Sequence, residues 1–271
     1  MKPAHTLEFA TATDPGMVRS HNEDSFEIDP ELGLAVLADG MGGYNAGEVA
    51  SGIAVAMIKE EMRNVLASGK GAGGPELAEA LITENSAKAN GAIYQTARSQ
   101  PQYAGMGTTL VVALFHGSQI TVGHIGDSRL YRYRAGQLEQ VTRDHSLLQE
   151  QIDSGMISKE QARYSQNKNL VTRAVGIDPE VETEVHTHDA LPGDIYLLCS
   201  DGLSDMVADE DIQSLVEQLQ SNLALAASQL VQLANDSGGR DNITVVLVRV
   251  GEASQAEATG GWMSKLKAWF K

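Results

Sequence analysis

Residues 108–141 read TTLVVALFHGSQITVGHIGDSRLYRYRAGQLEQV, and in this stretch four apolar or alternating runs are separated by short polar links. The pattern predicts strands over residues 108–115, 119–124, 129–133 and 137–141. The links His116-Gly117-Ser118, Gly126-Asp127-Ser128 and Ala135-Gly136 are short enough to favour antiparallel hairpins or meanders. The stretch therefore predicts antiparallel pairing in the middle of the chain.

The sequence on either side adds more strands and several helices. Further strands are expected over residues 5–13, 25–29, 33–38, 182–186, 194–200 and 242–250. Helices are expected over residues 47–67, 76–98, 145–153, 158–164, 209–220 and 223–234. The strands come in two batches around the long helix pair and do not alternate with helices, which argues against a doubly wound parallel sheet. The predicted fold class is α+β, with antiparallel sheets packed on one another and helices outside.

The composition limits the classes of function. The chain has 271 residues and a formal net charge of −16, which argues against a nucleic-acid partner because the phosphate backbone demands a basic surface. The single cysteine, Cys199, rules out an internal disulfide and a cysteine-based zinc site and is expected in the core. The first ten residues do not form a secretory signal, and no run of about 18 apolar residues exists. A cytoplasmic monomer fits best.

The domain is predicted to occupy residues 1–250, followed by a flexible linker over residues 251–261. A short amphipathic tail, residues 262–271, then places Trp262, Leu266 and Trp269 on one helical face with lysines among them. It is too short to span a bilayer but could lie on an anionic membrane surface or dock on a partner. The alternative is that it packs on its own domain or stays disordered.

Three aspartates stand at the ends of predicted strands. Asp39 and Asp201 follow a strand and precede a glycine, and Asp241 precedes Asn242 and a strand. Carboxylates at strand ends present oxygen ligands at the rim of a sheet, and Gly40 and Gly202 let the main chain approach an ion closely. A lone Asp-Gly pair is more often a turn, so the surrounding motifs decide between the two interpretations.

Six motifs in this order resemble the metal-dependent type 2C serine/threonine protein phosphatases in their compact bacterial form. They are Arg19-Ser20-His21-Asn22-Glu23-Asp24, Asp39-Gly40-Met41-Gly42-Gly43, Gly107-Thr108-Thr109, Gly126-Asp127-Ser128-Arg129, Ser200-Asp201-Gly202-Leu203-Ser204-Asp205 and Gly239-Arg240-Asp241-Asn242-Ile243-Thr244. The resemblance covers about residues 8–250. It implies a sandwich of two antiparallel sheets with helices on both outer faces, in agreement with the strand pattern.

The resemblance also implies a role for each matching residue. Asp39 would bridge two metal ions, and the carbonyl of Gly40 would bind the first. Asp201 and Asp241 would bind the second ion. A third, weaker ion would be held by Asp127 and Asp201, with Asp205 nearby. Glu23 and Asp24 would support the metal site, largely through water, and Arg19 would grip the substrate phosphate.

Hard oxygen ligands suit Mn²⁺ or Mg²⁺ better than zinc or copper. Two such ions about 4 Å apart can lower the pKa of a shared water and aim it at phosphorus. Arg19 can hold two phosphate oxygens at once and offset their developing charge. We therefore expect direct attack by water, with no phosphoenzyme and no further cofactor.

Met41 departs from the family pattern, because many eukaryotic members have a histidine there that is a proposed general acid. A methionine cannot donate a proton, and His21, His124 and His145 are candidate substitutes, although a lone histidine is more often structural. Residues 145–187 match a region that includes a mobile flap beside the catalytic cleft. This region either contributes to substrate choice and to admission of the third ion or is an ordinary polar loop.

The predicted function is hydrolysis of phosphoserine and phosphothreonine esters in signalling proteins, in opposition to a bacterial serine/threonine kinase. The main alternative is a catalytically silent regulator that binds phosphoproteins with the same fold. The intact set of Asp39, Asp201, Asp241 and Arg19 argues against it. A two-metal phosphodiesterase is a third alternative, which the net charge disfavours for a nucleic-acid substrate.

Overall fold

The computed structural model describes residues 2–43, 46–67, 73–158, 161 and 170–253, and its strands form two antiparallel sheets. The first sheet has the order β1 (His5–Asp14), β11 (Ile243–Ala253), β10 (Ile195–Cys199), β7 (Arg129–Arg134) and β8 (Gln137–Gln140). The second has the order β2 (Asp24–Asp29), β3 (Leu34–Met41), β5 (Leu110–His116), β6 (Gln119–Ile125) and β9 (Glu184–Asp189), with β4 (Gly107–Thr108) paired to β3. The predicted α+β class is confirmed.

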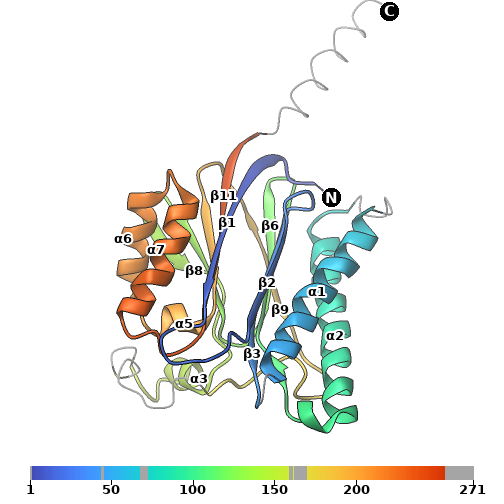
Figure 1. Ribbon diagram of the computed structural model, residues 1–271. Helices are drawn as coiled ribbons and strands as arrows, with labels where there is room; N and C mark the ends of the chain where they lie inside the picture. Colours follow the sequence, from blue (N-terminus) through green and yellow to red (C-terminus); the bar gives the residue numbers. More distant parts are fainter. Residues whose placement is uncertain (1, 44–45, 68–72, 159–160, 162–169, 254–271) are drawn as a thin grey trace, which may run out of the picture.

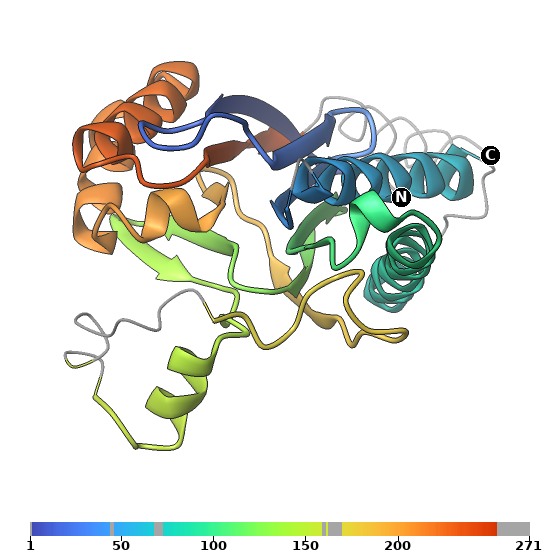
Figure 2. The same cartoon turned by 60° about the horizontal axis from the view of Figure 1, so that its bottom comes forward.

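Helices cover both outer faces of this sandwich (Figure 1). The first sheet is covered by α6 (Asp209–Leu219) and α7 (Leu223–Asp236), and the second by α1 (Ala46–Ala67) and α2 (Pro75–Ser99). Three short helices complete the described elements: η1 (Pro101–Tyr103), α3 (Leu147–Asp153) and α5 (Asp201–Ser204). Figure 2 shows the end of the sandwich near which α3 and α5 lie.

Strict alternation along the strands divides the core into three apolar layers. In β5, Leu110, Val112 and Leu114 pack toward α1 and α2. The intervening Val111, Ala113 and Phe115 pack between the two sheets. A third layer lies between the first sheet and α5, α6 and α7. Because β5 is buried on both sides, it reads as a continuous apolar run rather than as an alternating one.

The layer between the sheets changes from apolar to polar at one end. Phe26 and Leu37 belong to this layer, so the same alternation places Asp24 and Asp39 on its side of β2 and β3. Six residues continue the inner faces of the strands at this end: Asp24, Asp39, Thr109, Ser128, Ser200 and Thr244. Their contacts confirm the placement, since the Ser200 hydroxyl donates to Asp24 Oδ2 at 2.7 Å across the sheets.

The Gly126-Asp127-Ser128 link is not the hairpin that its length favoured. β6 pairs with β5 and β9, whereas β7 pairs with β8 and β10, so the link carries the chain from one sheet to the other. Gly126 has φ +102°, and a Cβ there would lie 2.7 Å from the Thr109 side chain. Only glycine fits this close crossing, and Asp127 consequently lies between the sheets.

Several predicted boundaries also differ from the structure. β3 continues to Met41, so Asp39 lies within the strand and not after it. β11 continues to Ala253, which moves the start of the predicted linker beyond residue 250. Most of the predicted helix 158–164 and all of the tail 262–271 lie outside the described residues. Within the described ranges, no helix is long and apolar enough to cross a membrane.

Two leucines on opposite sides of the core boundary test this packing. Leu198 is fully buried between the sheets, whereas Leu225 on α7 is 42% exposed. Leu198→Ala should lower the free energy of unfolding by about 2–5 kcal/mol, because it removes buried methyl groups and leaves a cavity. Leu225→Ala should change it by about 0.5 kcal/mol or less. Urea unfolding in EDTA measures both, and equal losses would contradict the packing.

Candidate metal centre

Asp39 and Asp24 are cross-strand partners at the polar end of the inner layer. They face each other in the β2–β3 register, a pairing in which two like charges destabilise a sheet. The main chain of Asp39 is fixed on both sides: its N–H donates to Thr109 Oγ1 at 2.9 Å, and its carbonyl accepts from Thr108 Oγ1 at 2.8 Å. The fold therefore holds two carboxylates together where their repulsion must be offset.

Asp201 enters from the other sheet, at the start of α5. The close approach of α5 to the beginning of β11 depends on Gly202, because a Cβ there would lie 2.0 Å from the Asn242 carbonyl oxygen. Gly40 has a similar role between β3 and α1, where a Cβ would lie 2.2 Å from the Gly47 carbonyl oxygen. Both glycines of the Asp-Gly motifs thus allow main-chain segments to meet at the site.

Asp241 and Asn242 connect the start of β11 to the segment that carries Arg19. Arg19 Nη2 donates to Asp241 Oδ2 at 2.7 Å, and the Arg19 side chain is 52% exposed. The Asn242 side chain accepts from the Glu23 N–H at 2.8 Å and donates to the carbonyls of Pro15 and His21. Asn242 therefore fixes the loop before β2 against the opposite sheet.

Asp127 completes the group from the crossing between β6 and β7. It is 8% exposed and lines a cleft of about 450 Å³ together with Asp201 and Asp205. The apolar side of this cleft includes Leu148 and Ile152 of α3. The segment between α3 and residue 170, part of the proposed flap, lies largely outside the described residues.

Burial and mutual repulsion raise the pKa of these carboxyl groups. Burial, opposed by hydrogen bonds from Ser200 and Thr244, raises the pKa of Asp24 to about 6. Burial and the nearby charge of Asp144 raise the pKa of Asp127 to about 6. The pKa values of Asp39 and Asp201 lie well above the usual range, first through burial and then through the neighbouring aspartates.

Divalent cations fit this set of residues. The acidic side chains offer only oxygen atoms as metal ligands, and oxygen is the ligand type that Mg²⁺ and Mn²⁺ prefer. Asp24 Oδ1 is buried and has no hydrogen-bond partner in the described part of the chain, although a buried polar atom normally has one. Bound cations would satisfy that atom and offset the repulsion that raises the pKa values.

The structure thus gathers the acidic residues that the sequence singled out. Glu23 lies in the segment before β2. Partial burial raises its pKa, and the opposing effects of Arg19 and the Gly47 N–H do not cancel that rise. The six sequence motifs include Thr109, Ser200 and Asn242, but sequence reasoning gave none of these three supporting side chains a role. The alternation of β10 could have placed Ser200 on the inner face, but no local signal predicted the hydrogen bonds that Thr109 and Asn242 make.

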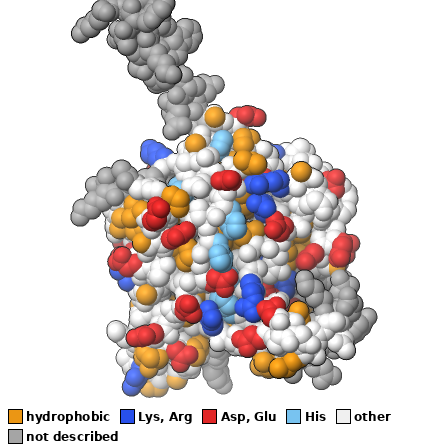
Figure 3. Space-filling model, turned by 180° about the vertical axis from the view of Figure 1, so that it is seen from behind, with side chains coloured by type: hydrophobic (Ala, Val, Ile, Leu, Met, Phe, Trp, Pro, Cys, Tyr) orange, Lys and Arg blue, Asp and Glu red, His pale blue; other side chains and the backbone are white. Residues whose placement is uncertain are grey.

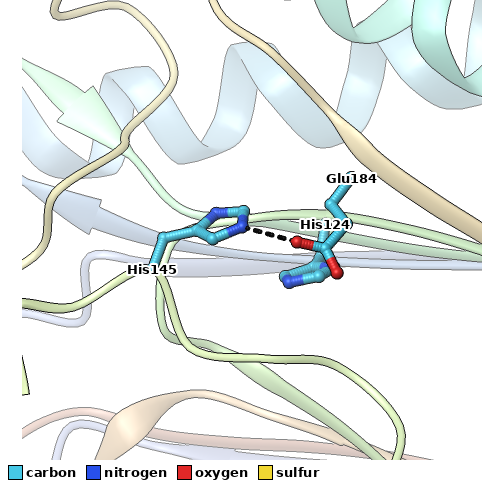
Figure 4. A group of neighbouring side chains, drawn as sticks. All are labelled: His124, His145 and Glu184. Carbon is cyan, nitrogen blue, oxygen red and sulfur yellow. Dashed lines mark hydrogen bonds and ion pairs between the residues drawn. The ribbon is translucent and has the colours of Figure 1, made fainter. Parts of the chain in front are cut away.

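None of the three candidate histidines replaces the proton donor that Met41, at the end of β3, cannot supply. His21 is exposed. His124 and His145 are buried and, with Glu184, form a separate group whose ligand atoms lie within 4.8 Å of one another (Figure 4). Burial lowers the pKa of both histidines, which favours their neutral forms.

Comparisons with known proteins agree with the geometry. The sequence matches the family described as "Protein phosphatase 2C" over residues 18–235. It is 38% identical to the serine/threonine phosphatase stp of Listeria welshimeri, over 87% of this chain and 93% of that protein. It is 41% identical to the serine/threonine protein phosphatase PstP of Mycobacterium tuberculosis, over 90% of this chain but only 45% of that protein.

Solved structures show the same similarity. The catalytic domain of PstP in complex with two manganese ions has a TM-score of 0.80 and 39% identity, covering 91% of this chain and 99% of that one. The serine/threonine phosphatase Stp1 from Staphylococcus aureus has a TM-score of 0.84 and 32% identity, covering 93% and 98%. On the family match and these relatives, the chain belongs to the protein phosphatase 2C family of metal-dependent serine/threonine protein phosphatases.

Proposed function

We propose that this chain hydrolyses phosphoserine and phosphothreonine esters of proteins by direct attack of water at the aspartate cluster. The observation that carries the proposal is the cluster itself: partly buried carboxylates with raised pKa values lie beside a half-exposed arginine. Such an arrangement suits cations that bind a phosphate together with a guanidinium. The presence of every proposed ligand favours turnover over a catalytically silent regulator.

The roles implied by the sequence resemblance are proposed for the residues as they lie here. Asp39 would bridge two cations, with the Gly40 carbonyl on the first and Asp201 and Asp241 on the second. Asp127, Asp201 and Asp205 would hold a third, weaker cation. Glu23 and Asp24 would support the site from β2 and the segment before it.

Mn²⁺ or Mg²⁺, when bound, supplies a water of lowered pKa and positive charge for the phosphoryl oxygens. The protein's own contribution is to hold its carboxylates convergent and to orient Arg19. The 2.7 Å hydrogen bond to Asp241 aims the guanidinium at the site, while its exposure lets it meet an incoming phosphate. A planar guanidinium can bind two phosphate oxygens at once.

The proposed substrates are phosphoproteins of a bacterial serine/threonine kinase pathway, because the similar bacterial proteins are named serine/threonine phosphatases. We propose that this activity is cytoplasmic, because cysteines are kept reduced in that compartment and this chain does not use a disulfide. Cys199 is buried as expected. Membrane or partner docking through residues 262–271 falls outside the described residues.

Metal dependence gives the direct test of the proposal. Hydrolysis of a phosphothreonine peptide should be abolished by EDTA and restored by Mn²⁺. Asp39→Asn should lower kcat by about 100-fold or more, the scale of losing one electrostatic contact in a transition state. The matched control is Asp236→Asn on the exposed end of α7, which should leave kcat unchanged. Activity that survives chelation would refute the proposal.

Arg19 offers a second test, on phosphate recognition. Arg19→Lys keeps the charge but loses the two-pronged contact, so kcat/KM should fall about tenfold, the scale of a hydrogen bond to a charged group. Arg98→Ala, on the surface of α2, is the control and should have no effect. If Arg19→Lys retains full kcat/KM, its proposed contact with the phosphate is wrong.

The raised pKa values predict opposite pH dependences with and without metal. A carboxyl group whose pKa is raised on folding binds more protons in the folded than in the unfolded protein, so stability falls as pH rises. With Asp24 and Asp127 at pKa values of about 6, the EDTA-treated protein should lose stability between about pH 4 and 7. Mn²⁺ competes with those protons, so its stabilisation should increase over the same range. Thermal unfolding at several pH values measures both, and a pH-independent Mn²⁺ effect would contradict this electrostatic account.

A further inference from the structure

His145 lies in a hydrogen-bond network directly behind the turn that carries Asp127. Its main-chain N–H donates to the Gly126 carbonyl at 2.9 Å. In return, the Gly126 N–H donates to His145 Nδ1 at 3.2 Å. The turn is therefore held on both polar groups of Gly126 by one residue.

The other ring nitrogen of His145 is anchored on β9. Because Nδ1 accepts from Gly126, the hydrogen of the neutral ring lies on Nε2, which faces Glu184 Oε2 at 3.2 Å. Partial burial alone would raise the pKa of Glu184, but the hydrogen bonds with His186 and His145 outweigh it and lower the pKa to about 2. An ionised Glu184 thus fixes the ring orientation and the tautomer of His145.

Two further contacts hold the ring and its main chain. His124, opposite Glu184 in the β6–β9 register, stacks on His145 with ring centroids 4.7 Å apart and planes 17° apart. The His145 carbonyl accepts from the Thr172 N–H at 2.8 Å. His145 is 3% exposed. His145 therefore contacts three segments: the turn that carries Asp127, the chain at Thr172 within the region 145–187, and β9.

Two histidines and a glutamate could also suggest a separate metal site, but the geometry favours a hydrogen-bond network. An ion lies in the plane of each coordinating imidazole at about 2.0–2.1 Å from nitrogen, whereas stacked, nearly parallel rings direct their lone pairs side by side. His145 Nε2, moreover, carries the hydrogen that Glu184 accepts. Figure 4 shows this hydrogen bond and the two rings.

We propose that His145 is a positioning residue, which fixes the turn that carries Asp127 and thereby sets the cation affinity of that carboxylate. The inference rests on the proposed third-cation site of Asp127, Asp201 and Asp205. Residues that orient a metal ligand typically change the metal affinity about 10–100-fold when they are replaced. Glu184 supports the same orientation from β9, close to the surface, where its second oxygen lies 2.8 Å from the half-exposed His186. Histidine side chains align among acidic and basic ones on the face shown in Figure 3.

Two substitutions separate the two ends of the His145 ring. His145→Asn keeps an acceptor at the Nδ1 position for the Gly126 N–H but no longer reaches Glu184. His145→Gln keeps a donor near the Nε2 position but removes the acceptor for Gly126. Calorimetric titration of the whole protein with Mn²⁺ should show the weakest affinity reduced about tenfold or more in His145→Gln and by about two- to threefold in His145→Asn, which loses only the Glu184 contact. His116→Gln, at a buried histidine bonded to Thr121, is the control.

The Asp127→Asn background shows whether the effect passes through Asp127. There His145→Gln should cause no further loss of Mn²⁺ affinity, because effects that share one pathway are not additive. Equal weakening by the Asn and Gln variants, or a loss that persists in the Asp127→Asn background, would overturn the inference. Unchanged Mn²⁺ binding in Asp127→Asn alone would instead refute the third-cation site, and the inference with it.

Thermal midpoints in EDTA show whether the His145 variants fold. If they do not, Glu184→Gln tests the same network at a partly exposed side chain. The neutral amide orients His145 less firmly, so the weakest Mn²⁺ affinity should fall severalfold while the EDTA midpoint stays the same. An unchanged affinity would overturn the inference.

Discussion

Repulsion among closely packed carboxylates at one end of the sandwich is the constraint on which the rest of the site depends. Asp24 and Asp39 are brought face to face by strand pairing, and Asp127 and Asp201 approach from the opposite direction. The pKa values of these carboxyl groups are raised, first by burial and then by the neighbouring charges. Cations offset that repulsion, so the same geometry that strains the metal-free protein makes it a strong ligand set.

The three apolar layers stabilise the fold that holds these carboxylates close together. The strand that carries Asp39, β3, is buried on both sides by the helices and by the opposite sheet, so its end cannot move away without opening the core. Hydrogen bonds complete the clamp: Ser200 links Asp24 to the other sheet, and Asn242 holds the segment before β2. Preorganised ligands of this kind need little rearrangement when a substrate binds.

The chain crosses from one sheet to the other next to the aspartate cluster, so the connection between the sheets also positions a proposed metal ligand. Asp127 lies on a turn whose shape depends on Gly126, on the Thr109 side chain beside it and on His145. His145 in turn contacts the base of the flap region and β9. The proposed third-cation position therefore shares its supports with the part of the molecule that borders the cleft.

The sequence alone determined the antiparallel α+β class, the long helix pair and the burial of Cys199, because period-two alternation and apolar runs are local signals. The acidic residues proposed for the site were singled out by three strand-end aspartates together with the resemblance of six motifs to a known family. The sequence could not determine that the Gly126–Ser128 link leaves its sheet, since a hairpin and a crossing have the same length and composition. Nor could it place Thr109, Asn242 and the His145–Glu184 pair around the aspartates. Those contacts join segments up to 227 residues apart, and only the packing of two sheets against each other brings them together.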